Sequence, residues 1–323
     1  MDSTLYQTTE ADFSETVPNK RTLFRPYWLD GYFYFGNSKR VATLTDIKYI
    51  DDKTLVVAHR EASKLYLVSF DGENYQRISE FTVDTRRLLN RFFHPDLIAL
   101  NGNKIYMTEY GGRCVEITLN RQKFKLTNKV YAGNYNYHGI HYSDGRIYLG
   151  ADRDGVMTVL NDSLKVIDTI LLPELQGTEQ RIKTIGQEGD LFILGIDVQH
   201  GPANIPNDGG DSWIKIGRIN GKNINFIDDI MLKNCQIDGH ILHKGLHYLT
   251  LDDGDAGCGK IIVVRIQSDK LEKVSEISVD GFPHGIDIRN GMLSYTSYAT
   301  SKLKTIKLPE EITQIYAARS EAS

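Results

Sequence analysis

The chain repeats one unit six times, and this repeat constrains its fold more than any other feature. Each copy holds an apolar run, a tight polar turn and a second apolar run, followed by a longer polar loop and further short runs. Gly, Asn and Asp in the turns tolerate the positive φ that tight hairpins require. The turns lie at 51–53, 101–103, 143–145, 188–190, 243–245 and 289–291. A four-stranded unit that recurs about every 40 to 50 residues is typical of a β-propeller blade.

We therefore predict an all-β fold, a six-bladed β-propeller formed by one domain over residues 21–308. The last copy supplies only three strands, so we expect an N-terminal strand at Tyr27–Phe35 to complete the last blade and close the ring. A seventh blade around residues 22–40 is the alternative. Residues 1–20 and 309–323 lack strand patterning and are interpreted as a peripheral N-terminal segment and a C-terminal tail.

Charge and hydropathy exclude several classes of function. The chain has 38 Lys and Arg against 42 Asp and Glu, and no basic stripe, so nucleic-acid binding is not expected. No stretch approaches the roughly 18 apolar residues of a membrane helix, and no signal segment opens the sequence. Phosphate-binding and dinucleotide fingerprints are absent. These patterns predict a cytoplasmic protein without membrane insertion or a nucleotide cofactor.

One face of the predicted propeller gathers ionisable residues around the central channel. This face carries the longer loops, where function usually resides, and the start of every innermost strand. Counting back from the turns, the residues nearest the axis are Thr45, Asp96, His138, Ile182, Asp238 and His284. The ends of the second strands add His59, Glu109, Tyr110, Asp152, Asp197, Asp252 and Tyr298. The six-fold arrangement would place like residues opposite each other across the channel.

Imidazoles and carboxylates that converge in this way have two chemical uses. They can bind a divalent ion, with histidine favouring zinc or iron and an oxygen-rich set favouring calcium. They can also act as acid and base without a metal. We predict His138, His284, Asp238 and Asp96 as catalytic residues, and His138 and His284 also as metal ligands. For each residue alone, capping of a loop is the alternative.

Further residues on this face are predicted to bind a small-molecule substrate in the channel. Arg181 can direct a cation at an anionic ligand, and His240 follows Asp238 by two residues, so strand alternation can place both on one side. The predicted substrate-binding residues are Arg181, His240, Tyr110, Asp152, Tyr298 and His59. The long segment Asp197–Trp213 is expected to cover the channel mouth.

Two blades carry a recognisable motif. Phe282–Ile286 (FPHGI), followed by Arg289–Gly291, resembles the opening of an NHL-type propeller repeat, and His138–Ile140 with Ser143–Gly145 is similar to it. Six-bladed propellers with such repeats include gluconolactonase and paraoxonase type calcium enzymes, strictosidine synthase-like proteins, zinc-dependent peptidylglycine amide lyases and protein-binding NHL domains.

The resemblance implies different sites for different members. For the lyases it implies channel histidines on a metal, and His138 and His284 are the matching positions. The calcium hydrolase pattern is not reproduced, because Thr45 and Ile182 stand at two axial positions. We expect an enzyme that acts on a small molecule, with metal-assisted lyase or hydrolase chemistry. The alternative is a non-catalytic propeller that binds a peptide or protein partner on its loop-rich face.

Overall fold

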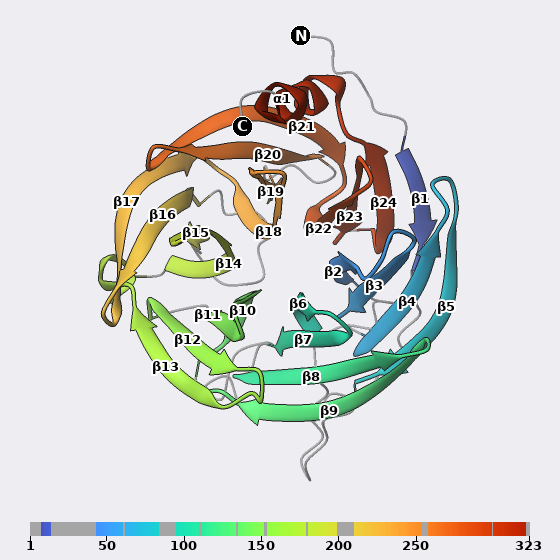
Figure 1. Ribbon diagram of the computed structural model, residues 1–323, viewed down its shortest axis with the longest axis horizontal. Helices are drawn as coiled ribbons and strands as arrows, with labels where there is room; N and C mark the ends of the chain where they lie inside the picture. Colours follow the sequence, from blue (N-terminus) through green and yellow to red (C-terminus); the bar gives the residue numbers. More distant parts are fainter. Residues whose placement is uncertain are drawn as a thin grey trace, which may run out of the picture.

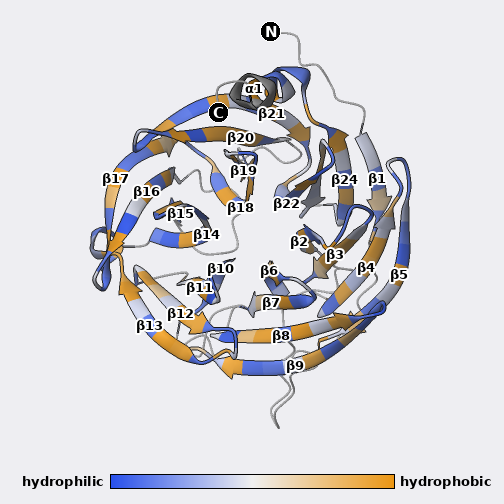
Figure 2. Ribbon diagram, in the orientation of Figure 1, coloured by the Kyte–Doolittle hydropathy of each residue, from blue (hydrophilic) through white to orange (hydrophobic). Residues whose placement is uncertain are grey.

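The computed structural model describes residues 8–13, 43–60, 62–83, 95–109, 112–133, 135–151, 154–178, 180–198, 210–252, 258–298 and 300–320. Its strands form six four-stranded antiparallel units around a central axis (Figure 1). The chain is therefore a β-propeller, as the repeat predicted. Strands combine hydrophobic and hydrophilic residues along their length, as expected for sheets that pack face to face (Figure 2).

Each blade runs outward from the axis in chain order. Blade 1 contains β2 (Leu44–Tyr49), β3 (Thr54–His59), β4 (Lys64–Phe70) and β5 (Tyr75–Thr82), and blade 2 contains β6 (Pro95–Asn101), β7 (Lys104–Glu109), β8 (Arg113–Asn120) and β9 (Lys123–Tyr131). Blade 3 contains β10 (Tyr137–Ser143), β11 (Arg146–Ala151), β12 (Val156–Asn161) and β13 (Val166–Leu171). Blade 4 contains β14 (Gln180–Glu188), β15 (Leu191–Val198), β16 (Ser212–Asn220) and β17 (Asn223–Leu232).

The last two blades bring the chain back to its beginning. Blade 5 contains β18 (Gln236–His243), β19 (Leu246–Asp252), β20 (Cys258–Gln267) and β21 (Lys270–Asp280), and blade 6 contains β22 (Pro283–Arg289), β23 (Met292–Ser297), β24 (Lys302–Lys307) and β1 (Thr8–Asp12). The innermost strands pack against one another in ring order, and β22 packs on β2. The ring thus closes with six blades.

An N-terminal strand completes blade 6, as predicted, but the segment differs from the expected one. β1 (Thr8–Asp12) pairs antiparallel with β24, whereas the expected Tyr27–Phe35 lies outside the described residues. β1 falls within residues 1–20, which the sequence analysis set aside as peripheral. Its sequence, TTEAD, is polar and half exposed because it forms an outer edge, so it carries little strand patterning. Glu10 pairs with Lys302 on the neighbouring strand.

The innermost strand of every blade contains a bulge near its start. The pairing register with the second strand shifts by one residue in β2, β6, β10, β14, β18 and β22. A bulge of this kind redirects the side chain at the extra residue. Here it turns one residue per blade toward the axis, which builds the site described below.

Two short helices lie outside the blades. The 3-10 helix η1 (Pro173–Leu175) connects blades 3 and 4, and α1 (Glu310–Ser320) follows the last strand. Ile312 of α1 is fully buried in the apolar cluster between blades 5 and 6, so part of the expected C-terminal tail packs on the propeller. No helix in the described part of the chain is long and apolar enough to cross a membrane.

Candidate functional site

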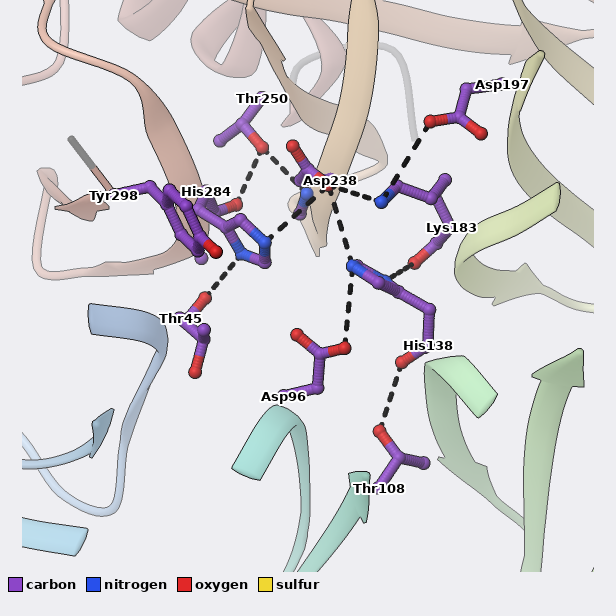
Figure 3. A network of polar contacts seen from close by, with 12 residues as sticks. Thr45, Asp96, Thr108, His138, Lys183, Asp197, Asp238, Thr250, His284 and Tyr298 are labelled. Carbon is purple, nitrogen blue, oxygen red and sulfur yellow. Dashed lines mark hydrogen bonds and ion pairs between the residues drawn. The ribbon is translucent and has the colours of Figure 1, made fainter. Parts of the chain in front are cut away.

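Five polar side chains from blades 2 to 6 meet at the loop-rich end of the channel. We call Asp96, His138, Lys183, Asp238 and His284 the hub cluster (Figure 3). Their residues are between 0% and 6% exposed. All five occupy the bulge of an innermost strand, so the bulges explain why residues far apart in sequence converge. The four residues predicted as catalytic therefore do lie together.

Backbone carbonyls fix the orientation of both imidazoles. Nδ1 of His138 lies 2.7 Å from the carbonyl oxygen of Lys183, and Nδ1 of His284 lies 2.6 Å from that of Thr45. A carbonyl only accepts, so each Nδ1–H is the donor and Nε2 carries the lone pair in the neutral ring. Both Nε2 atoms face the hub cluster (Figure 3). This arrangement resembles the carbonyl-oriented histidines of metal sites.

Asp238 lies at the centre of the hub cluster. Its Oδ1 is 3.1 Å from Nζ of Lys183 and 3.6 Å from Nε2 of both His138 and His284. Burial alone would raise the pKa of Asp238, but the charge of Lys183 and its hydrogen bond outweigh burial and hold this pKa below its usual range. Asp238 is therefore an ionised carboxylate with Lys183 as its counter-ion.

Among the described residues, no lysine or arginine acts as a counter-ion of Asp96. Both carboxylate oxygens are buried, and neither accepts a hydrogen bond from any of the described residues. Its Oδ2 lies 3.7 Å from Nε2 of His138. A buried carboxylate without hydrogen bonds is costly, so this group is suited to a ligand that supplies positive charge.

His138 is neutral in this environment. Burial lowers the pKa of His138 to about 3; Lys183 acts in the same direction, and Asp96 opposes it. Metal ions bind the neutral imidazole, so the lowered pKa leaves Nε2 available as a ligand over the physiological pH range.

The ligand atoms of Asp96, His138 and His284 fit a metal ion. One atom from each lies within 4.8 Å of the others. Bonds of about 2.1 Å in a tetrahedral shell place ligand atoms about 3.4 Å apart, close to the 3.7 Å between His138 and Asp96. Two imidazoles with one carboxylate are typical ligands of zinc and Fe(II), whereas calcium takes six to eight oxygens.

Tyr298 extends the site on the side of blade 6. Its ring stacks on His284 with centroids 5.2 Å apart and an interplanar angle of 18°, and Phe282 lies 5.7 Å from it. Arg60 donates to the Tyr298 hydroxyl at 3.4 Å. The predicted position of Tyr298 near the axial histidine is therefore observed, with an aromatic wall beside it.

Of the other predicted substrate-binding residues, Arg181, His240 and His59 are among the described residues. Arg181 is buried on β14 opposite Asp197 of β15, and His240 turns toward blade 4. His59 lies at the end of β3, where its Nδ1 accepts the backbone N–H of Ala62, so it supports a turn. Tyr110 and Asp152 lie outside the described residues, as does most of the segment 197–213.

Lys183 is the hub residue that the sequence analysis missed. Counting back from the turn placed Ile182 at the axis, but Ile182 packs in the apolar cluster between blades 3 and 4 and Lys183 occupies the bulge. The apolar residue after the bulge gives a better reference than the turn. In five blades the residue two places before an isoleucine is the one in the bulge, and these isoleucines are Ile47, Ile98, Ile140, Ile185 and Ile286.

Comparison with known proteins supports the fold. No protein family and no curated protein matches the sequence. Among solved structures, the WD40 repeats of RRP9 superpose with a TM-score of 0.54 at 10% identity, covering 83% of this chain and 95% of that one. Hydrazine synthase of Kuenenia stuttgartiensis superposes with a TM-score of 0.55 at 12% identity, covering 82% of this chain and 77% of that one. Virginiamycin B lyase from Staphylococcus aureus superposes with a TM-score of 0.53 at 13% identity, covering 94% of this chain and 100% of that one.

These structures share the architecture at identities too low to indicate a common function. They include repeats of the WD40 type and a lyase, and they do not single out the NHL or gluconolactonase type that the motifs resemble. The chain is a β-propeller whose channel holds a buried cluster of two carboxylates, two imidazoles and one ammonium group.

Proposed function

We propose that this protein is a metal-dependent enzyme that acts on a small molecule in the channel, with hydrolase or lyase chemistry. The observation that carries the proposal is the set of three ligand atoms from Asp96, His138 and His284 within 4.8 Å of one another. Neither carboxylate oxygen of Asp96 accepts a hydrogen bond from the described residues, and backbone carbonyls orient the two imidazoles so that their Nε2 atoms face the hub cluster.

Zinc or Fe(II) is the ion that this donor set favours. Such an ion polarises a substrate oxygen or lowers the pKa of a bound water. Asp96, His138 and His284 would hold it, and the remaining residues would handle the substrate. Because Lys183 compensates Asp238, we leave Asp238 outside the set of metal ligands.

Asp238 and Lys183 have complementary roles in this proposal. Asp238 is ionised and central, so it can orient a substrate hydroxyl or accept a proton from it. Lys183 supplies positive charge within 3.1 Å of that carboxylate, where it can stabilise negative charge on a substrate oxygen. Hydrolysis and β-elimination both need these two features.

The test is elemental analysis of the purified protein after loading with zinc, together with the double variant His138→Ala, His284→Ala. His141→Ala is the matched control, because His141 lies three residues after His138 on the same strand but outside the hub cluster. We expect one ion per chain in the wild type and the control, and none in the double variant. Equal metal content in all three proteins would overturn the proposal.

Activity is tested on the same proteins. Panels of esters and lactones, and of substrates that can undergo β-elimination, are incubated with the zinc-loaded wild type, and products are identified by mass. We expect turnover that is lost in the double variant and in Asp238→Asn.

The competing function is a non-catalytic scaffold that binds a protein partner. The WD40 repeats among the solved structures of this shape favour it as an alternative. A scaffold would bind its partner with the hub residues replaced, and would not turn over any substrate in the panels. Metal binding at the hub cluster is the observation that separates the two functions.

A further inference from the structure

Blade 5 carries two histidines where the other blades carry apolar residues. The inner-strand residue that follows the bulge is isoleucine in five blades and His240 in blade 5. On the second strand, His247 occupies the position held elsewhere by Leu55, Ile105, Ile147, Phe192 and Leu293. These positions form the seams between blades. Polar groups in such a seam are costly unless they are hydrogen-bonded.

The two histidines form a hydrogen-bonded chain with a glutamate. Nε2 of His240 lies 3.0 Å from Nδ1 of His247, and Nε2 of His247 lies 2.9 Å from Oε2 of Glu188. Glu188 closes β14 at the turn, on the opposite face from the hub cluster. Since the carboxylate accepts, the neutral His247 carries its proton on Nε2 and receives the Nε2–H of His240 on Nδ1.

This series of hydrogen bonds runs from the solvent at Glu188 to the interior of the propeller. The side chain of Glu188 is 36% exposed, whereas that of His247 is fully buried. The ring of His240 is half-buried and lies against Gly186 of β14, where an added Cβ would come within 2.0 Å of it. His141 of β10 and Lys48 of β2, on the innermost strands of two other blades, act electrostatically on His240, so its ring lies near the channel.

Burial and the charges around His240 lower the pKa of its ring. Burial lowers the pKa of His240 well below its ordinary value, and His247, His141 of β10 and Lys48 of β2 act in the same direction. The backbone of Ile185 opposes them and favours the protonated ring. The ring of His240 is therefore neutral at physiological pH.

We propose that Glu188, His247 and His240 form a proton relay between the solvent at the turn face and the channel. When Nδ1 of His240 takes up a proton, its Nε2 proton moves to Nδ1 of His247, and the Nε2 proton of His247 moves to Glu188. Transfer in the other direction restores both tautomers, so atoms and charge balance. The use of these protons by the hub cluster rests on the proposed function, whereas the relay itself does not.

The test follows exchange of the imidazole protons with D2O by NMR of protein labelled with ¹⁵N-histidine. Glu188→Gln is the decisive variant, because the amide oxygen still accepts a hydrogen bond but the side chain cannot take up a proton. We expect both histidines to carry Nε2–H in the wild type. We also expect exchange at His240 to be slower in the variant by about tenfold or more.

Two further variants keep the test decisive. His240→Ile gives blade 5 the isoleucine that the other five blades have at this position. We expect this variant to fold and to bind the same amount of metal as the wild type. Loss of the relay can then be distinguished from loss of the metal site. If Glu188→Gln does not fold, His247→Phe, with the residue that blade 4 has at this position, interrupts the same chain. Equal exchange at His240 in the wild type and the variant, or an Nδ1–H tautomer on His247, would overturn the relay.

Discussion

The ammonium group of Lys183 lies 3.1 Å from Oδ1 of Asp238, and this pair joins blade 4 to blade 5 inside the channel. The same oxygen lies 3.6 Å from Nε2 of His138 and of His284. The carboxylate of Asp238 thus contacts a counter-ion and the two histidines among the three candidate metal ligands. Asp96 differs, because no lysine or arginine in the described part of the chain pairs with it. The hub cluster therefore contains one carboxylate with a counter-ion, Asp238, and one that is available to a ligand, Asp96.

Replacement of Lys183 tests the compensated pair. Lys183→Met leaves Asp238 as a buried charge without its counter-ion, so we expect the free energy of unfolding to fall by about 3 to 5 kcal/mol. The double variant Lys183→Met, Asp238→Asn should recover most of that loss. Urea denaturation gives the free energy of unfolding of both variants. A double variant as unstable as Lys183→Met would show that the loss comes from packing of the lysine side chain.

Replacement of Asp96 has opposite effects on stability and on metal binding. Asp96→Asn removes a buried charge that has no hydrogen-bonding partner among the described residues, so we expect the metal-free protein to gain about 1 to 3 kcal/mol. Zinc affinity should fall by at least about tenfold, because one ligand is lost. Denaturation and zinc titration give the two values. A metal-free Asp96→Asn protein that is less stable than the metal-free wild type would contradict the interpretation of Asp96 as a buried charge without a partner among the described residues.

Acid should destabilise the protein through its buried histidines. Burial, with Lys48, lowers the pKa of His141 to about 4. The unfolded chain therefore binds more protons between about pH 4 and pH 6.5, and stability present above pH 6.5 is lost as the pH falls. Between pH 7 and pH 5 the wild type should lose about 1 to 2 kcal/mol more than His141→Gln. If urea denaturation shows that the wild type and His141→Gln lose equal free energy of unfolding between pH 7 and pH 5, His141 is not the cause.

The repeat predicted the fold and most of the hub cluster, because blade period and turn chemistry are local properties. His138, His284, Asp96 and Asp238 converge as expected. Lys183 was missed because the spacing between the hub residue and the turn differs between blades: Lys183 precedes Gly189 by six residues, whereas His138 precedes Gly145 by seven. In the five blades that have an isoleucine two residues after the hub position, counting from this isoleucine does not depend on the turn.

Two other features depend on contacts between distant segments. β1 was not predicted, because an outer-edge strand such as Thr8–Asp12 needs little apolar patterning and is specified by partners such as Lys302. His240 was expected to face the substrate, because strand alternation places it with Asp238. The bulge breaks this alternation, and the ring of His240 lies against Gly186 of blade 4.

Removal of residues 1–13 tests how the ring closes. The deletion removes β1 and leaves the edge of β24 without a partner. An open edge can pair with another chain, so we expect a melting temperature several degrees lower and partial self-association. Differential scanning calorimetry and size-exclusion chromatography follow the two effects. A deletion protein that melts like the full chain and remains monomeric would show that β1 does not contribute to closure.

Anomalous scattering from crystals of the zinc-loaded protein, measured at the zinc absorption edge, tests the metal site most directly. We expect one peak in the channel, within bonding distance of Nε2 of His138, Nε2 of His284 and the carboxylate of Asp96, with Asp238 still paired to Lys183. A channel without a peak, or a peak bound by other residues, would contradict the account.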